Sequence, residues 1–140
     1  MSASLPPVTL LTPEGDGYVP GVCNIGPWEI RRRRTIGIVG IVAAIVLFAA
    51  LVAAGAPPIA RLLVLLPLWG GTLSWLQARR RFCAGFAMAG ISNFTDGEAG
   101  RRAVTDPAAH RADVAATMRM TRDSFLIALP ITIVAVLLPV

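Results

Sequence analysis

Lysine is absent from this chain of 140 residues, so all thirteen basic residues are arginine. Histidine occurs once and cysteine only twice, which is too few cysteines for a disulfide-stabilised scaffold. The sequence also lacks a nucleophile elbow, a paired metal motif and a phosphate-binding loop. We therefore predict that the protein is not an enzyme and uses no cofactor.

Charged residues are missing from three long stretches of the chain, at 35–60, 62–78 and 124–140. The chain is 55% hydrophobic, which is more than a soluble domain of this size usually carries. A helix needs about 20 apolar residues to cross a hydrocarbon core of about 30 Å, because it rises 1.5 Å per residue. The pattern predicts an all-α membrane protein.

The first two uncharged stretches predict a transmembrane helical hairpin within residues 31–81. The first helix is expected over 35–54, since Pro57 and Pro58 remove backbone donors and force extended geometry. The second helix is expected over 62–78. The connection between the two helices is very short, so they should lie antiparallel.

Two arginine clusters flank this hairpin, while a single arginine, Arg61, lies at its tip. Short loops rich in arginine stay on the cytoplasmic side, so both clusters should be cytoplasmic and the tip outside. The sequence thus predicts a multi-pass protein of the bacterial inner membrane and does not indicate nucleic-acid binding, despite a net charge of +5. The arginines expected to set topology and contact lipid headgroups are Arg31, Arg32, Arg33, Arg34, Arg79, Arg80 and Arg81.

The remaining chain predicts three further segments. Residues 1–30 are rich in proline and glycine and should be extended, either as a free tail or as a strap on the protein or a partner. Residues 82–123 should form an interfacial helix or re-entrant piece over 82–94 and then a cytoplasmic segment, with a helix that starts at Pro107 and could run straight into the last uncharged stretch. Residues 124–140 predict a third, C-terminal transmembrane helix that ends outside, with an interfacial end as the alternative.

One local sequence pattern is shared with other proteins. Cys23-Asn24-Ile25-Gly26-Pro27 precedes the first arginine cluster, and Arg81-Phe82-Cys83 follows the hairpin. Together with Gly90 and Asn93-Phe94, this arrangement resembles a family of small bacterial polytopic membrane proteins. The resemblance covers about residues 23–94. It implies a polytopic membrane protein and carries no activity with it.

Cys23 and Cys83 are the candidate metal or redox residues. Both should lie on the cytoplasmic side, each within about eight residues of an arginine cluster, and nearby positive charge favours the thiolate that binds metals. His110 is a weaker third ligand, because the spacing matches no zinc motif. The alternative is that both cysteines are small buried apolar residues.

Small residues mark the faces expected to pack against other helices, because they let helix backbones approach closely in lipid. With no ionisable group inside the three apolar stretches, an autonomous transporter is disfavoured. We therefore expect an accessory or structural subunit of a larger inner-membrane complex, possibly an energy-transducing one, bound to the lipid bilayer and other membrane subunits. A thiol-dependent protein and a small homo-oligomeric transporter or channel remain the alternatives. The expected packing residues are Gly40, Ala44, Gly70 and Gly71.

Overall fold

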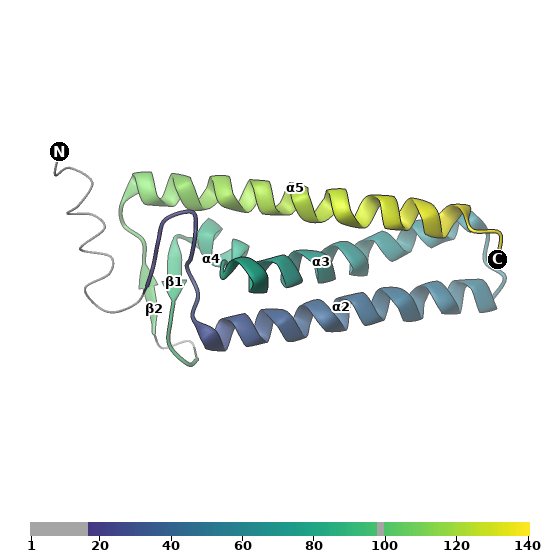
Figure 1. Ribbon diagram of the computed structural model, residues 1–140, viewed down its shortest axis with the longest axis horizontal. Helices are drawn as coiled ribbons and strands as arrows, with labels where there is room; N and C mark the ends of the chain where they lie inside the picture. Colours follow the sequence, from purple (N-terminus) through teal and green to yellow (C-terminus); the bar gives the residue numbers. More distant parts are fainter. Residues whose placement is uncertain (1–16, 98–99) are drawn as a thin grey trace. The chain divides into compact units, whose positions relative to one another are not determined.

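Helices dominate the computed structural model, which describes residues 17–97 and 100–140 (Figure 1). The elements, in chain order, are α2 (Pro27–Ala53), the 3-10 helix η1 (Pro58–Val64), α3 (Leu65–Arg80), α4 (Ala84–Ala89), β1 (Ile91–Asn93), β2 (Arg101–Ala103) and α5 (Pro107–Leu137). The extended tail or strap predicted for residues 1–30 falls, over residues 1–16, outside the described residues.

The chain forms two units, which are treated separately below. The first, called the head, comprises Met1–Arg33 and Gln77–Arg119. The second, called the three-helix unit, comprises Arg34–Leu76 and Met120–Val140. Each unit has its own set of buried residues.

Three helical stretches are long and apolar enough to cross a membrane, namely Pro27–Ala53, Pro58–Arg80 and Pro107–Leu137. In their most apolar windows only 11%, 33% and 22% of the residues are buried inside the chain. So much outward-facing apolar surface is unfavourable in water and suits a lipid environment. The prediction of three helices able to span a membrane is confirmed at this level.

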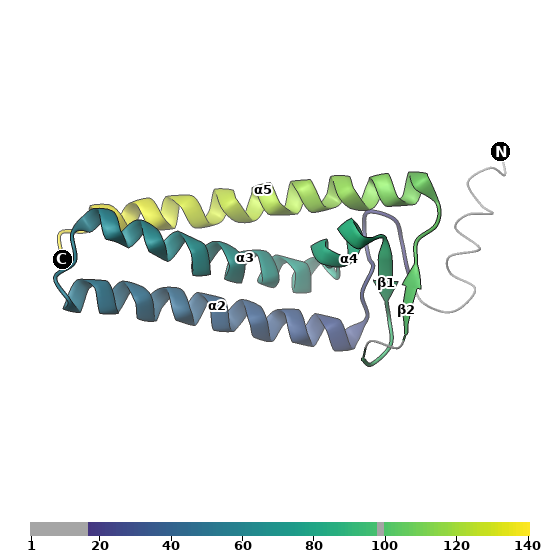
Figure 2. The ribbon, with the colours of Figure 1, turned by 180° about the vertical axis from the view of Figure 1, so that it is seen from behind.

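In the three-helix unit, segments of α2, η1 with α3, and α5 lie side by side in both views of the ribbon (Figure 1, Figure 2). A small buried cluster joins them: Ala44 from α2, Val64 and Leu68 from the second helical stretch, and Ala128 from α5. Leu47, Phe48 and Trp69 are among the partly buried side chains around this cluster. Alanine at two of these positions lets the helix backbones approach closely.

The head contains a small antiparallel sheet, so the description as all-α is only approximate. β1 and β2 pair with Ile91 opposite Ala103, Ser92 opposite Arg102, and Asn93 opposite Arg101. On the other side of β1, Ile25 forms a parallel bridge with Asn93. The backbone of β1 is therefore held by hydrogen bonds to residues that are distant in the sequence.

Residues 82–94 were expected to form one helix or a re-entrant piece, and that expectation is wrong in detail. The helix α4 covers only six residues and ends at Gly90, which has a left-handed φ of 71°. Glycine adopts this conformation without steric cost, so it is a common helix terminator. β1 begins at the next residue, Ile91.

The first long helix starts earlier than expected. α2 begins at Pro27, so the arginines 31–34 lie inside the helix and do not precede it. Proline is well suited to a first helical position, because the N–H it lacks has no partner there in any case. α5 begins at Pro107 and continues unbroken through Pro130 to Leu137, so the helix expected to start at Pro107 runs straight into the last uncharged stretch, as predicted.

Candidate functional site

Asn24 is the centre of a buried polar cluster in the head. Its side chain has no exposed surface. The amide nitrogen Nδ2 donates to the carbonyl oxygen of Cys83 at 3.1 Å, and the backbone nitrogen of Cys83 donates to Oδ1 at 2.7 Å. The backbone of Asn24 is also paired: its nitrogen donates to Arg81, and its carbonyl accepts from Asn93. One side chain thus fixes a segment 59 residues further along the chain.

Asn93 extends this cluster on the side of β1. Its carbonyl accepts a hydrogen bond from the nitrogen of Gly26 at 2.9 Å, and its Oδ1 accepts from the backbone and hydroxyl of Thr95. Gly26 must remain a glycine, because a Cβ there would lie 2.9 Å from the Cα and the carbonyl oxygen of Phe94. Structural roles therefore explain this stretch. Asn24 binds the backbone of Cys83, Gly26 allows the close approach of Phe94, and Pro27 starts α2.

The three-residue connection after α3 is equally constrained. Arg81 follows the last residue of α3 with a positive φ of 55°, the conformation in which glycine is usual. Its carbonyl oxygen accepts from the nitrogen of Asn24 at 3.2 Å. The side chain of Gln77 also holds this turn, because its Oε1 accepts from the nitrogen of Ala84. The second arginine cluster thus ends in a strained backbone position.

A second polar contact joins residues 18–23 to α5. The phenol oxygen of Tyr18 donates to Oδ2 of Asp113 at 2.7 Å, and the nitrogen of Gly21 donates to Oδ1 at 2.7 Å. Asp113 and Tyr18 are 0% and 2% exposed. Burial, the hydrogen bond to Asp113 and then nearby negative charge raise the pKa of Tyr18 well above its ordinary value. No local pattern marks Asp113, because its partners lie 95 and 92 residues away.

Glu29 is a buried carboxylate in the first turn of α2. Its carboxylate oxygens lie 3.7 Å from Nη1 of Arg32 and 3.9 Å from Nε of Arg33, and both distances are too long for a hydrogen bond. Its position near a helix N-terminus favours the negative charge. Arg32 also lies over the ring of Trp28, with its guanidinium carbon 5.9 Å from the ring centroid. The first cluster thus has an internal counter-charge.

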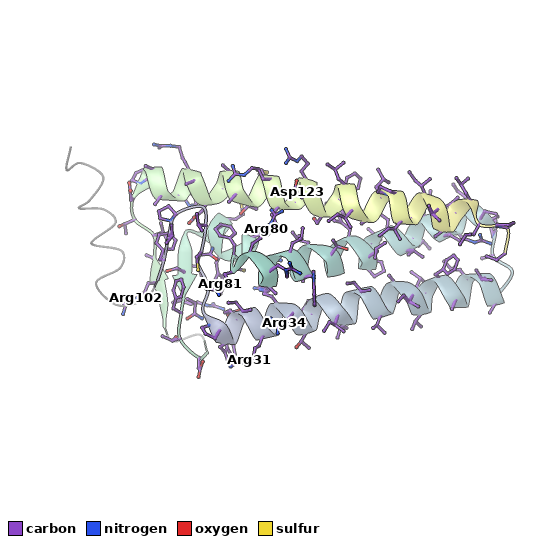
Figure 3. All side chains as sticks on the ribbon, viewed as in Figure 1. Arg31, Arg34, Arg80, Arg81, Arg102 and Asp123 are labelled. Atoms are coloured by element: carbon purple, nitrogen blue, oxygen red, sulfur yellow. The ribbon has the colours of Figure 1, made fainter. Side chains whose placement is uncertain are left out.

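The arginines expected to contact headgroups lie on the surface of the head, apart from the half-buried Arg33 and from Arg34, which belongs to the three-helix unit. Figure 3 labels Arg31, Arg80 and Arg81 among the side chains of the head. Arg101 of β2 lies with its guanidinium carbon 5.1 Å from the ring centroid of Phe86. Exposed residues of the two clusters in the head are thus Arg31, Arg32, Arg79, Arg80 and Arg81.

Cys23 and Cys83 are both free thiols in the head. Cys83 has no exposed surface, and Cys23 is partly buried with its sulfur 3.7 Å from the carbonyl oxygen of Ile25. Burial raises the pKa of Cys23, and the nearby backbone of Ile25 and charge of Arg81 lower it by less. This environment favours the thiol over the thiolate expected above. Among residues 17–97 and 100–140, no group of three or more metal-ligating side chains comes together.

His110 does not join the cysteines. It lies near the end of α4, where a Cβ on Gly90 would be 3.6 Å from its Nδ1. Nδ1 is buried without a hydrogen-bond partner.

The expected packing glycines lie in the three-helix unit, and two of them face each other. A Cβ on Gly40 would lie 2.6 Å from Cα of Gly71, and a Cβ on Gly71 would lie 2.7 Å from the nitrogen of Ile41. Ala44 is 2% exposed in the core of the same unit. Gly70 has nothing within 4 Å of its Cβ position. Three of the four residues thus pack against other helices of this chain. Gly70 is the one of the four that leaves space for a neighbouring molecule.

Arg61 makes a set of contacts that its sequence position did not predict. It is 3% exposed, and its Nη1 donates to the carbonyl oxygens of Ala135 and Leu138 at 3.2 and 2.8 Å. Its Nη2 donates to the carbonyl oxygen of Val140. Ala135 lies in the last turn of α5, whose carbonyls lack intrahelical partners, and Leu138 and Val140 belong to the residues that follow the helix. The arginine at the hairpin tip therefore caps α5.

The chain matches no known family model, no curated protein and no solved structure at a significant level. The structure shows a largely helical protein with three helices able to cross a membrane and a small head that contains helices and a two-stranded sheet.

Proposed function

We propose that this protein is a non-catalytic accessory subunit of a larger complex in the bacterial inner membrane. The polar side chains of the three-helix unit support this role, because they donate hydrogen bonds to backbone carbonyls of the same unit. Arg61 caps α5, Thr132 donates to the carbonyl of Ala128, and Ser124 donates to that of Thr121. Groups used in this way hold a structure together and are not positioned for chemistry or ion transfer.

The outward surface of the three-helix unit is the second support. Long apolar side chains point away from the chain on all its helices, including Ile45 on α2, Leu66 on α3 and Val134 on α5 at 62%, 66% and 58% exposure. In lipid, such surface accepts either acyl chains or another helix. Gly70, open to its surroundings on α3, is the place where a foreign backbone could approach most closely.

The head provides the water-facing part of the proposed subunit. Its core is fixed by Asn24 and Asp113, while its exposed arginines suit anionic lipid headgroups or an acidic partner surface. We place it on the cytoplasmic side, with the Pro57-Pro58 tip outside, because short arginine-rich segments are retained there. We also propose that the chain is related to the small bacterial polytopic proteins that its sequence resembles, which fits this placement.

Co-purification tests the subunit role. A tagged full-length chain extracted in a mild detergent should elute with other membrane proteins in fixed proportion. Gly70→Leu should reduce their retention, because it fills the open position on α3, whereas Ala43→Leu, at an exposed position on α2, serves as the control that adds a leucine elsewhere. A chain that elutes alone from its native membrane under the mildest extraction contradicts the role.

The thiol-dependent alternative has one observation in its favour. Asn24 holds the backbone of Cys83, so the segments carrying the two cysteines are neighbours in the head. The complete burial of Cys83 and the raised pKa of Cys23 argue for two packing residues instead. We therefore rank this alternative second, and the homo-oligomeric channel third.

A further inference from the structure

The two arginine clusters border the same buried core of the head. Ile30, the residue directly before the first cluster, packs against the core residues around Cys83. Cys83 itself lies two residues after the second cluster. The carbonyl oxygen of Arg81 accepts from the nitrogen of Asn24, which lies three residues before the start of α2. The start of α2 and the end of α3 are therefore neighbours in the head, and so are the clusters that they carry (Figure 3).

Arg81 occupies a backbone position that suits glycine better. Its φ is 55°, in the left-handed region, and it directly follows the last residue of α3. Glycine is the usual residue in this conformation, because it has no Cβ to clash with the backbone. A residue held in such a strained conformation is often one whose side chain takes part in binding. The arginine at this position thus points to a function for its guanidinium group.

Three arginines of the two clusters have donors that could bind a ligand. The guanidinium groups of Arg79 and Arg81 are exposed and have no hydrogen bond or ion pair among residues 17–97 and 100–140. Arg32 lies over the ring of Trp28, and its Nη1 is 3.7 Å from Glu29, which is too long for a hydrogen bond. A guanidinium group binds phosphate oxygens through two parallel N–H···O bonds. These three side chains therefore suit a phosphate ligand.

The level of the clusters along their helices points to a lipid as the source of the phosphate. The first cluster lies near the start of α2, and Arg79 and Arg80 lie in the last turn of α3. Both helices belong to stretches that are long and apolar enough to cross a membrane. Charged residues near the ends of such stretches lie at the level of the lipid headgroups. An anionic headgroup is therefore closer to these donors than an acidic protein surface in the solvent.

We propose that Arg32, Arg79 and Arg81 together bind the headgroup of one diphosphatidylglycerol molecule, with one phosphate at each cluster. This lipid carries two phosphates that are joined through one glycerol. Packed helices lie about 8–10 Å apart, so extended arginine side chains on neighbouring helix ends reach both phosphates at once. A lipid with a single phosphate meets only one cluster and is held less tightly. The site rests on the proposed cytoplasmic placement of the head and needs no partner protein.

Lipid retention by the purified full-length chain tests the proposal. The delipidated chain is mixed with diphosphatidylglycerol, or with phosphatidylglycerol at the same total phosphate, and examined by native mass spectrometry. We expect one bound diphosphatidylglycerol per chain and weaker retention of phosphatidylglycerol. Arg32→Gln and Arg81→Gly should each weaken this retention about fivefold, because each removes one cation from the anionic headgroup. Arg111→Gln removes the same charge from an exposed position of the head on α5 and should leave retention unchanged.

The variant Arg81→Gly also separates binding from folding. Glycine relieves the left-handed φ, so the melting temperature of the lipid-free chain should equal or exceed that of the wild type. Added diphosphatidylglycerol should raise the melting temperature of the wild type and of Arg111→Gln more than that of Arg81→Gly, because a ligand stabilises the state that binds it.

Equal lipid retention or equal melting shifts in Arg81→Gly and Arg111→Gln would overturn the proposal. So would equal retention of the two lipids at matched phosphate. If Arg81→Gly loses co-purifying proteins while its lipid retention is unchanged, the clusters bind an acidic protein surface, and the lipid site is wrong. The co-purification experiment with Gly70→Leu measures the subunit role separately, so either proposal can fail without the other.

Discussion

The side chain of Asn24 pairs with both backbone groups of Cys83, accepting from its nitrogen at 2.7 Å and donating to its carbonyl at 3.1 Å. A side-chain amide can mimic a backbone in this way, because it carries one acceptor and a donor in the same plane. The conspicuous cysteine at position 83 is therefore held by its backbone, and its thiol takes no part in the contact. In this motif the asparagine is the structural residue.

Replacing Asn24 tests this finding. Asn24→Ala leaves the buried backbone nitrogen of Cys83 without a partner and removes one of the two hydrogen bonds at its carbonyl, which keeps the bond from the nitrogen of Ala87. The loss should cost about 1–3 kcal/mol of head stability. Amide exchange should accelerate at residues 81–84 and 91–93, while the three-helix unit keeps its protection. Met88→Ala, at an exposed position in the head, serves as the control. If the backbone amide of Cys83 exchanges at the same rate in Asn24→Ala as in the wild type, Asn24 does not hold the backbone of Cys83.

The alkaline titration of Tyr18 is a second test. Tyr18 is the only tyrosine, so tyrosinate absorbance reports it alone. Because its pKa is raised in the folded head, the stability that it contributes is complete below about pH 10 and falls as the pH rises further. We expect ionisation well above pH 10, coincident with unfolding of the head. Asp113→Asn should move the midpoint down towards pH 10, and a wild-type midpoint already at that value would show that Tyr18 is not buried against Asp113.

Two glycines of the three-helix unit should respond oppositely to the same change. Gly40→Ala places a methyl group 2.6 Å from Cα of Gly71, so the helices must separate, at a cost of roughly 1–3 kcal/mol. Gly70→Ala meets nothing within 4 Å and should be neutral or stabilising by up to about 1 kcal/mol, because alanine favours a helix. Thermal unfolding in detergent, followed by circular dichroism, measures both. Equal melting temperatures for the two variants contradict the close approach.

Arg61 should protect the end of α5. Arg61→Met keeps the apolar stem but removes the donors to Leu138 and Val140, so exchange of the backbone amides of Leu138 and Val140 should rise by about tenfold or more. Arg79→Met, at an exposed position in the second cluster, should not affect these amides. If the exchange of the Leu138 and Val140 amides is the same in both variants, Arg61 is not the cap.

The proposed orientation is open to a labelling experiment. In a chain with Cys23→Ser and Cys83→Ser, a cysteine introduced at Ala56 should react with an impermeant thiol reagent in intact cells, because the proposed orientation places the hairpin tip outside. A cysteine at Ser4 should react only after the cells are opened. The reverse pattern shows that the arginine clusters are not cytoplasmic.

The sequence by itself determined the three helices and several of their ends. Uncharged stretches of 17 residues or more require a backbone that satisfies its own hydrogen bonds, and only a helix does so within one segment. Pro57 and Pro58 separate the first two helices, and Pro107 starts the last, because proline acts on its own backbone and immediate neighbours. Such signals are local and can be read along the chain.

The tertiary structure alone decided the head and the use of the polar residues. The start of α2 was misplaced because four consecutive arginines resemble a flanking loop, although Glu29 and the proline before it begin the helix earlier. β1 is three residues long, too short for a periodic pattern, and its partners at Ile25 and on β2 come from elsewhere in the chain. The roles of Asn24, Asp113 and Arg61 depend on partners 59 to 95 residues away. A hydrogen bond requires two groups to meet in space, and only the folded chain shows which ones do.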